Sequence, residues 1–161
     1  MISTNHKEQL KDFVVSFAEG FPQDVLDQTG HRLPYNIVGG VFYGSLVQGE
    51  FRTYSDIDLG IIIDSNLVDR EEPTENIRKI QRDWLLRRIY QDTSIDRVVQ
   101  ITVGPVSMLR PGANKAWSEG QPWGIGFLVA DHDTEFVMRT PKDIRDRFKS
   151  VIRDGVPWAE G

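Results

Sequence analysis

The run IDLGIII, residues 57–63, is the feature that most constrains the fold of this chain. It is almost continuously apolar and rich in β-branched residues, a composition that favours a β-strand. Apolar and polar positions alternate only weakly, which indicates a strand covered on both faces. Such a strand needs neighbouring strands and packing helices, so the sequence predicts an α/β fold.

Two further apolar runs predict the other central strands. NIVGGVFY, residues 36–43, has strand composition, and its two glycines indicate a close approach of another backbone. RVVQITV, residues 97–103, is closed by Gly104 and Pro105. With a strand at 56–63, these runs predict the centre of a mixed, twisted sheet.

Apolar residues at helical spacing predict the helices beside this sheet. The first helix has its apolar stripe over residues 10–18 and is expected to end at Gly20, with a shorter turn or helix following at 22–30. The second covers residues 77–89. Its other face carries five basic residues: Arg78, Lys79, Arg82, Arg87 and Arg88.

The C-terminal third has a less regular pattern. Residues 106–123 are rich in glycine and proline, and we expect a long loop there, with a short helix as an alternative. The segments 124–130 and 134–138 have the composition of a β-hairpin. A last helix is expected from Thr140 to Gly155.

Composition limits the class of protein. With 161 residues, 39% of them hydrophobic, we expect one domain over residues 1–161. There is no cysteine, which excludes disulfides and thiolate metal sites, and no apolar run reaches the roughly 18 residues of a membrane span. We therefore expect a cytoplasmic protein that does not bind membranes. The net charge of −5 makes a nucleic-acid partner unfavourable, because polynucleotide binding depends on clustered positive charge.

Two carboxylates interrupt the apolar strand at its beginning. Asp56 and Asp58 follow the pair Gly44-Ser45 in the pattern G-S-x10-D-x-D. Residues i and i+2 of a strand point to the same side, about 6–7 Å apart at Cα, so the two carboxylates can converge on hard cations. Ser45 lies where the strand should turn into a helix, and backbone N–H groups there can hold phosphates that Gly44 allows to come close.

This pattern resembles the nucleotidyltransferases of the DNA polymerase β superfamily, most closely the minimal nucleotidyltransferase branch, over residues 36–103. The resemblance implies the nucleotidyltransferase fold, with helices mainly on one face of the sheet. It also implies a third metal-binding carboxylate on the strand after the second helix, for which Asp96 is the candidate. The less favoured substitutes lie in the hairpin: Asp131, Asp133 and Glu135.

The function implied by the resemblance is transfer of a nucleoside monophosphate, AMP from ATP in our expectation, to a hydroxyl acceptor. Asp56, Asp58 and Asp96 would be the catalytic residues and hold two Mg²⁺ or Mn²⁺ ions, while Gly44 and Ser45 would bind the nucleotide. Members of the minimal branch include antitoxins that modify a partner toxin of the HEPN type, so a protein acceptor is one possibility; aminoglycosides and nucleic-acid ends are others. The alternative is a catalytically weak nucleotide-binding module that regulates or masks a partner.

Overall fold

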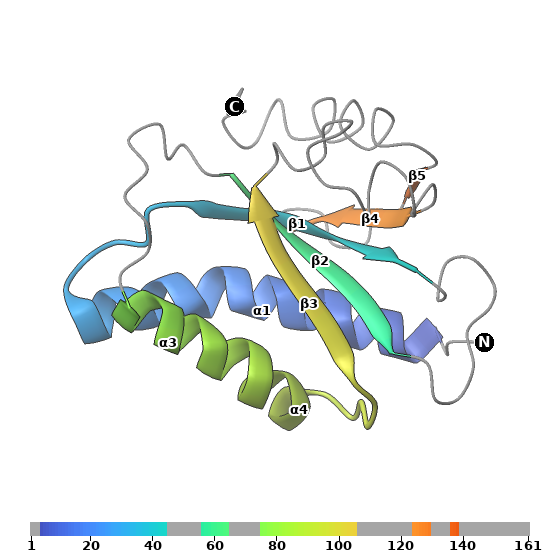
Figure 1. Ribbon diagram of the computed structural model, residues 1–161, viewed down its shortest axis with the longest axis horizontal. Coiled ribbons are helices and arrows are strands. Elements are labelled where there is room, and N and C mark those ends of the chain that lie inside the picture. Colours follow the sequence, from blue (N-terminus) through green and yellow to red (C-terminus); the bar gives the residue numbers. More distant parts are fainter. Residues whose placement is uncertain (1–3, 45–55, 65–74, 106–123, 130–135, 139–161) are drawn as a thin grey trace.

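Five strands form one mixed sheet in the order β3-β2-β1-β4-β5 (Figure 1). The computed structural model describes residues 4–44, 56–64, 75–105, 124–129 and 136–138. The strands within these ranges are β1 (Asn36–Tyr43), β2 (Ile57–Asp64), β3 (Val99–Pro105), β4 (Gly124–Leu128) and β5 (Phe136–Met138). The sheet confirms the three predicted central strands, although β2 and β3 begin one and two residues later than expected.

The central strand of the sheet is β1, which pairs antiparallel with both β2 and β4. On the far side of β2, β3 runs parallel to it, as a helical connection between two strands allows. β4 and β5 pair antiparallel, which confirms the predicted hairpin for its two strands. The segments 106–123 and 139–161, with the predicted loop and last helix, lie outside the described residues.

The helices pack on one face of the sheet, as predicted (Figure 1). α1 (Thr4–Thr29) lies beside a second helical segment made of α3 (Glu75–Asp83), a π-helical turn (Trp84–Arg88) and α4 (Ile89–Asp92). Helical backbone angles at Asp83 and Ile89 make this second segment continuous. In the described part of the chain, no helix has the length and apolar character needed to cross a membrane.

The prediction that the first helix ends at Gly20 was wrong. α1 continues through Gly20 and Pro22, although proline removes one backbone hydrogen bond from a helix interior. The apolar stripe explains the continuation, because Phe21 and Val25 extend it and are fully buried. The helix ends at Thr29, and Gly30 after it has a φ of +74°, the left-handed conformation common just past a helix C-terminus.

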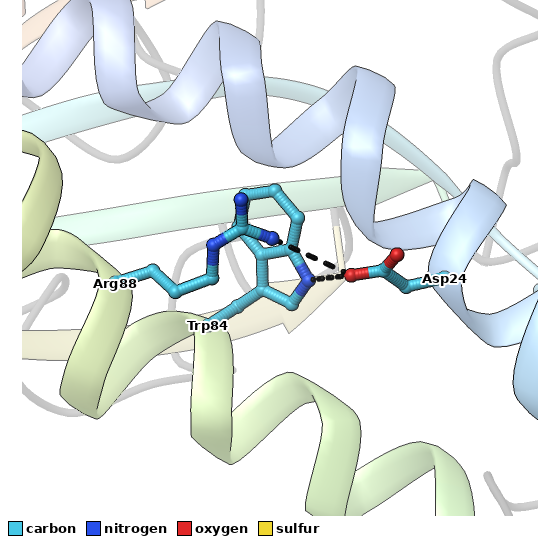
Figure 2. A network of polar contacts seen from close by, with 3 residues as sticks. All are labelled: Asp24, Trp84 and Arg88. Carbon is cyan, nitrogen blue, oxygen red and sulfur yellow. Dashed lines mark hydrogen bonds and ion pairs between the residues drawn. The ribbon is translucent and has the colours of Figure 1, made fainter.

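Gly20 does not end the helix; it allows close contact between α1 and the second helical segment. A Cβ atom on Gly20 would lie 2.6 Å from Cη2 of Trp84, so only glycine lets the indole ring come this close. Figure 2 shows how the ring is held: the indole N–H donates to Asp24 Oδ2 at 2.8 Å, and the Arg88 guanidinium lies 3.6 Å from the ring centre. Arg88 also reaches Asp24 Oδ2 at 3.4 Å. Trp84 is therefore fixed from three sides.

The two faces of β2 are both buried, as its composition predicted. Leu59, Ile61 and Ile63 belong to the core cluster that contains the helix residues. Ile62 is fully buried but lies outside that cluster, on the opposite face. Because side chains alternate along a strand, Asp58 shares the face of Ile62 and points away from the helices.

The close approach predicted at Gly39 and Gly40 is confirmed at the pairing of β1 with β4. A Cβ atom on Gly39 would collide with the Phe127 carbonyl oxygen, and one on Gly40 would lie 2.5 Å from the Phe127 ring. Gly39 therefore lets the backbone of β4 come close, and Gly40 lets the fully buried Phe127 ring lie on β1.

The contact between Gly20 and Trp84 gives the first testable prediction. Gly20→Ala should gain about 1 kcal/mol of helix propensity, but overpacking against a fixed ring costs about 1–3 kcal/mol. We expect net destabilisation of about 1 kcal/mol in urea unfolding. The matched test is the same substitution in a Trp84→Phe background, where the outer ring is absent and Gly20→Ala should become neutral or stabilising. Equal effects in both backgrounds would contradict this explanation.

Candidate functional site

The predicted carboxylates lie where β1 ends and β2 begins, on the sheet face away from the helices. Asp58 is paired with Tyr43, the last residue of β1, and on its other side with Gln100 of β3. Asp56 immediately precedes β2, and a hydrogen bond from Gln100 Nε2 to Asp56 Oδ2, 2.9 Å long, ties it to β3. Three strands therefore contribute to one site.

Asp56 and Asp58 are both partly exposed and interact electrostatically. Burial raises the pKa of Asp58 above its ordinary 3.8, and the negative charge of Asp56 raises it further. The Asp58 carboxyl group therefore holds its proton more tightly in the folded state than in the unfolded chain. As the pH rises above 3.8, ionisation of Asp58 lowers the free energy of unfolding of the metal-free protein. A bound cation would remove that cost.

Gly44 lies directly against the Asp58 carboxylate. A Cβ atom at this position would collide with Asp58 Oδ2, and the φ of +75° is one that other residues rarely adopt. Gly44 is also buried. The structure therefore brings Gly44 together with Asp58, whereas Ser45, the other residue predicted to bind the nucleotide, lies outside the described residues.

Two residues of this site were missed by the sequence analysis. The Tyr43 hydroxyl lies 3.3 Å from Thr102 Oγ1, so the Tyr43 side chain reaches across β2 to β3. At this level of β2 lies Gly60, which pairs with Thr102 and has no side chain. Burial raises the pKa of Tyr43, the hydrogen bond to Thr102 lowers it, and the charge of Asp58 raises it. The second missed residue is Gln100. Its polar side chain within an otherwise apolar strand was the feature of the sequence that could have identified it.

Asp96, the predicted third carboxylate, is exposed and precedes β3. The Ile57 N–H donates to the Val98 carbonyl at 2.9 Å, which marks where β3 begins to pair with β2, and Asp96 comes before that point. Across the described ranges, no three His, Cys, Asp or Glu side chains are grouped closely enough to hold a metal ion. The structure thus brings Asp56 and Asp58 together without Asp96, whose role stays a prediction; Asp131, Asp133 and Glu135 lie outside the described residues.

Residues 24–101 match the family model described as the nucleotidyltransferase domain. The matched range contains Gly44, Asp56, Asp58 and Gln100 and extends from the end of α1 into β3. Searches of curated proteins and of solved structures gave no significant match.

The contact of Gly44 with Asp58 predicts different effects for two glycine substitutions. Gly44→Ala and Gly30→Ala both introduce a side chain at positive φ, which costs roughly 1–2 kcal/mol of stability. A Cβ atom on Gly30 meets nothing within 4 Å, so Gly30→Ala is the matched control. Gly44→Ala should in addition displace the Asp58 carboxylate and lower nucleotidyl transfer by about 100-fold. Urea unfolding and pyrophosphate release measure the two effects, and equal activity of the variants would contradict the proposed contact.

Proposed function

Because residues 24–101 match the family model of the nucleotidyltransferase domain, we propose that the protein transfers AMP from ATP to a hydroxyl acceptor. The observation that carries the proposal is the pair of carboxylates, Asp56 and Asp58, on one face of the sheet with Gly44 against Asp58. In the reaction, the acceptor oxygen forms a bond to the α-phosphorus, the bond to the bridging oxygen breaks, and pyrophosphate leaves. The proton of the acceptor hydroxyl is released.

The residues of the site fit Mg²⁺ or Mn²⁺. Carboxylate oxygens are the ligands that these cations prefer, and both Asp56 and Asp58 remain partly exposed to solvent. Burial, and then the negative charge of Asp56, raise the pKa of Asp58, and a bound cation would stabilise its ionised form. Two ions in such a site would neutralise the charge that develops on the attacking and leaving oxygens. We propose Asp56 and Asp58 as their ligands. Asp96, which the sequence suggested as a third ligand, is exposed and precedes β3.

The other residues of the site would position the nucleotide. Gly44 leaves no side chain between the end of β1 and the carboxylates, so phosphate groups could come close to the backbone there. We propose that Gly44 and Ser45 bind the triphosphate. Tyr43, whose ring crosses β2 to Thr102, would form one wall of the same face.

For the acceptor we propose a hydroxyl of a partner protein, such as a HEPN-type toxin. The support is a hollow of about 410 Å³ between the second helical segment and β3. Its lining combines two arginines and a glutamine with apolar side chains: Arg78, Gln81, Arg82, Leu85, Leu86, Val99 and Ile101. A second hollow of about 290 Å³ adjoins it and shares Arg82 and Leu86, the latter 61% exposed. Basic and apolar groups together suit an acidic protein surface better than a small drug.

Not all of the predicted basic face is available for such a partner. Arg88 stacks on Trp84 and pairs with Asp24, so it belongs to the contact between the helices. Arg87 pairs with Asp83 at 3.4 Å, but both side chains are exposed. The proposed partner surface is therefore centred on Arg82.

The same surface supports the alternative function, a nucleotide-binding module that masks or regulates its partner. Both functions predict that Mg²⁺ with ATP raises the melting temperature. Release of pyrophosphate in the presence of the partner separates them, because the masking module binds the nucleotide without turnover.

Substitution of the carboxylates tests the proposed chemistry. Asp56→Asn and Asp58→Asn should each lower nucleotidyl transfer by several orders of magnitude, because the cations lose a charged ligand. The metal-free variants should melt at the same temperature as the parent or slightly higher at pH 7, since the repulsion that raises the pKa of Asp58 is relieved. Thermal melts with and without Mn²⁺ and a pyrophosphate assay measure both effects. Metal-dependent stabilisation that persists in the double variant would mean that the ions bind elsewhere.

Charge reversal tests the proposed partner surface. Arg82→Glu with Arg87→Glu should lower labelling of the partner protein by labelled ATP about tenfold, because complementary charge accelerates association. Nucleotide binding, followed by the ATP-dependent shift in melting temperature, should remain unchanged. Arg32→Glu is the matched control, since Arg32 is exposed and lines neither hollow. Loss of partner labelling in the control as well would contradict a specific surface.

A further inference from the structure

Gln100 occupies the strand position beside the carboxylate pair. β2 and β3 run parallel with Asp58 opposite Gln100 and Ile57 opposite Val99, so the side chains of Asp58 and Gln100 lie on the same face. From this position on β3 the Gln100 side chain reaches the carboxylate pair, since Gln100 Nε2 lies 2.9 Å from Asp56 Oδ2. Asp96 lies four residues earlier, before β3 begins.

The chemistry of the Gln100 amide sets what it can do there. An ionised carboxylate only accepts hydrogen bonds, so the NH₂ end of the amide must face Asp56. This bond fixes one oxygen of Asp56 by a neutral donor and adds no charge to the site. Asp58 is constrained from the other side, where Gly44 at the end of β1 lies against its carboxylate. Each carboxylate therefore has its own neighbour, contributed by a different strand.

We propose that Gln100 is a positioning residue that acts through Asp56, and that it takes the place of a third carboxylate beside Asp56 and Asp58. The inference rests on the proposed function, in which this pair binds divalent cations. A site with two negative charges in place of three binds cations less tightly before the nucleotide arrives, because affinity for hard cations increases with the number of charged ligands. The phosphates of the nucleotide then supply the remaining negative ligands.

Mn²⁺ binding to the full chain without nucleotide tests the proposal, measured by calorimetry and by electron paramagnetic resonance of free Mn²⁺. Gln100→Met keeps the length of the side chain but removes the donor, and we expect about 10–100-fold weaker Mn²⁺ binding, as for other residues that orient a metal ligand. Gln100→Glu adds a third carboxylate of the same shape and should tighten Mn²⁺ binding about tenfold or more. Its metal-free form should melt at a lower temperature than the parent, since three carboxylates then repel one another.

Asp92→Asn is the matched control, because Asp92 is exposed, lies at the end of α4 and has no role in the proposed site; it should bind Mn²⁺ like the parent. The proposal is overturned if Gln100→Met binds Mn²⁺ as tightly as the parent, or if Asp96→Asn weakens binding as much as Asp58→Asn does. If Asp56→Asn and Asp58→Asn also leave Mn²⁺ binding unchanged, the metal site of the proposed function fails together with this inference. Loss of binding in those two variants but not in Gln100→Met overturns the role of Gln100 alone. Circular dichroism of each variant shows whether it is folded, and Gln100 is exposed, so the core is not altered.

Discussion

The alternation of side chains along β2 is the constraint on which the site and the core both depend. Leu59, Ile61 and Ile63 face the helices, while Asp58 lies on the opposite face with Gly60 and Ile62. A shift of one residue in the pairing would bury Asp58 under the helices and move Leu59, Ile61 and Ile63 away from the core cluster to the opposite face. Pairing on both sides of β2, antiparallel with β1 and parallel with β3, excludes such a shift. The same pairing that forms the core therefore aligns the carboxylates.

The site itself depends on the ends of strands rather than on a loop. Gly44 follows β1, Asp56 precedes β2, and Gln100 is the second residue of β3, so all three lie near one edge where the strands are already held in register. A side chain on a paired strand is positioned more accurately than one on a free loop, and nucleotidyl transfer depends on accurate positioning. The helices act indirectly, because the fixed contact of Trp84 with α1 holds the second helical segment, which connects β2 to β3 (Figure 2).

The sequence predicted the strands and the carboxylate pair because both follow from local patterns. The run at 57–63 and the spacing of Asp56 and Asp58 need no knowledge of distant contacts. The end of the first helix was predicted wrongly, since Gly20 looks like a helix terminator until Trp84, distant in sequence, is seen to pack against it. Gln100 and Tyr43 were missed for a similar reason. Their roles depend on which residues face each other across strands, and a register between β2 and β3 cannot be read from either strand alone.

The position of β1 at the centre of the sheet has a consequence for synthesis on the ribosome. One edge of β1 is covered by β2, which follows it closely along the chain, but the other edge pairs with β4, some 80 residues later. At the usual synthesis rate of 5–20 residues per second, this second edge stays unpaired for about 4–16 s. Unpaired edges are prone to join other chains. Until β4 has been synthesised, this edge of β1 is therefore open to pairing with a strand of another molecule.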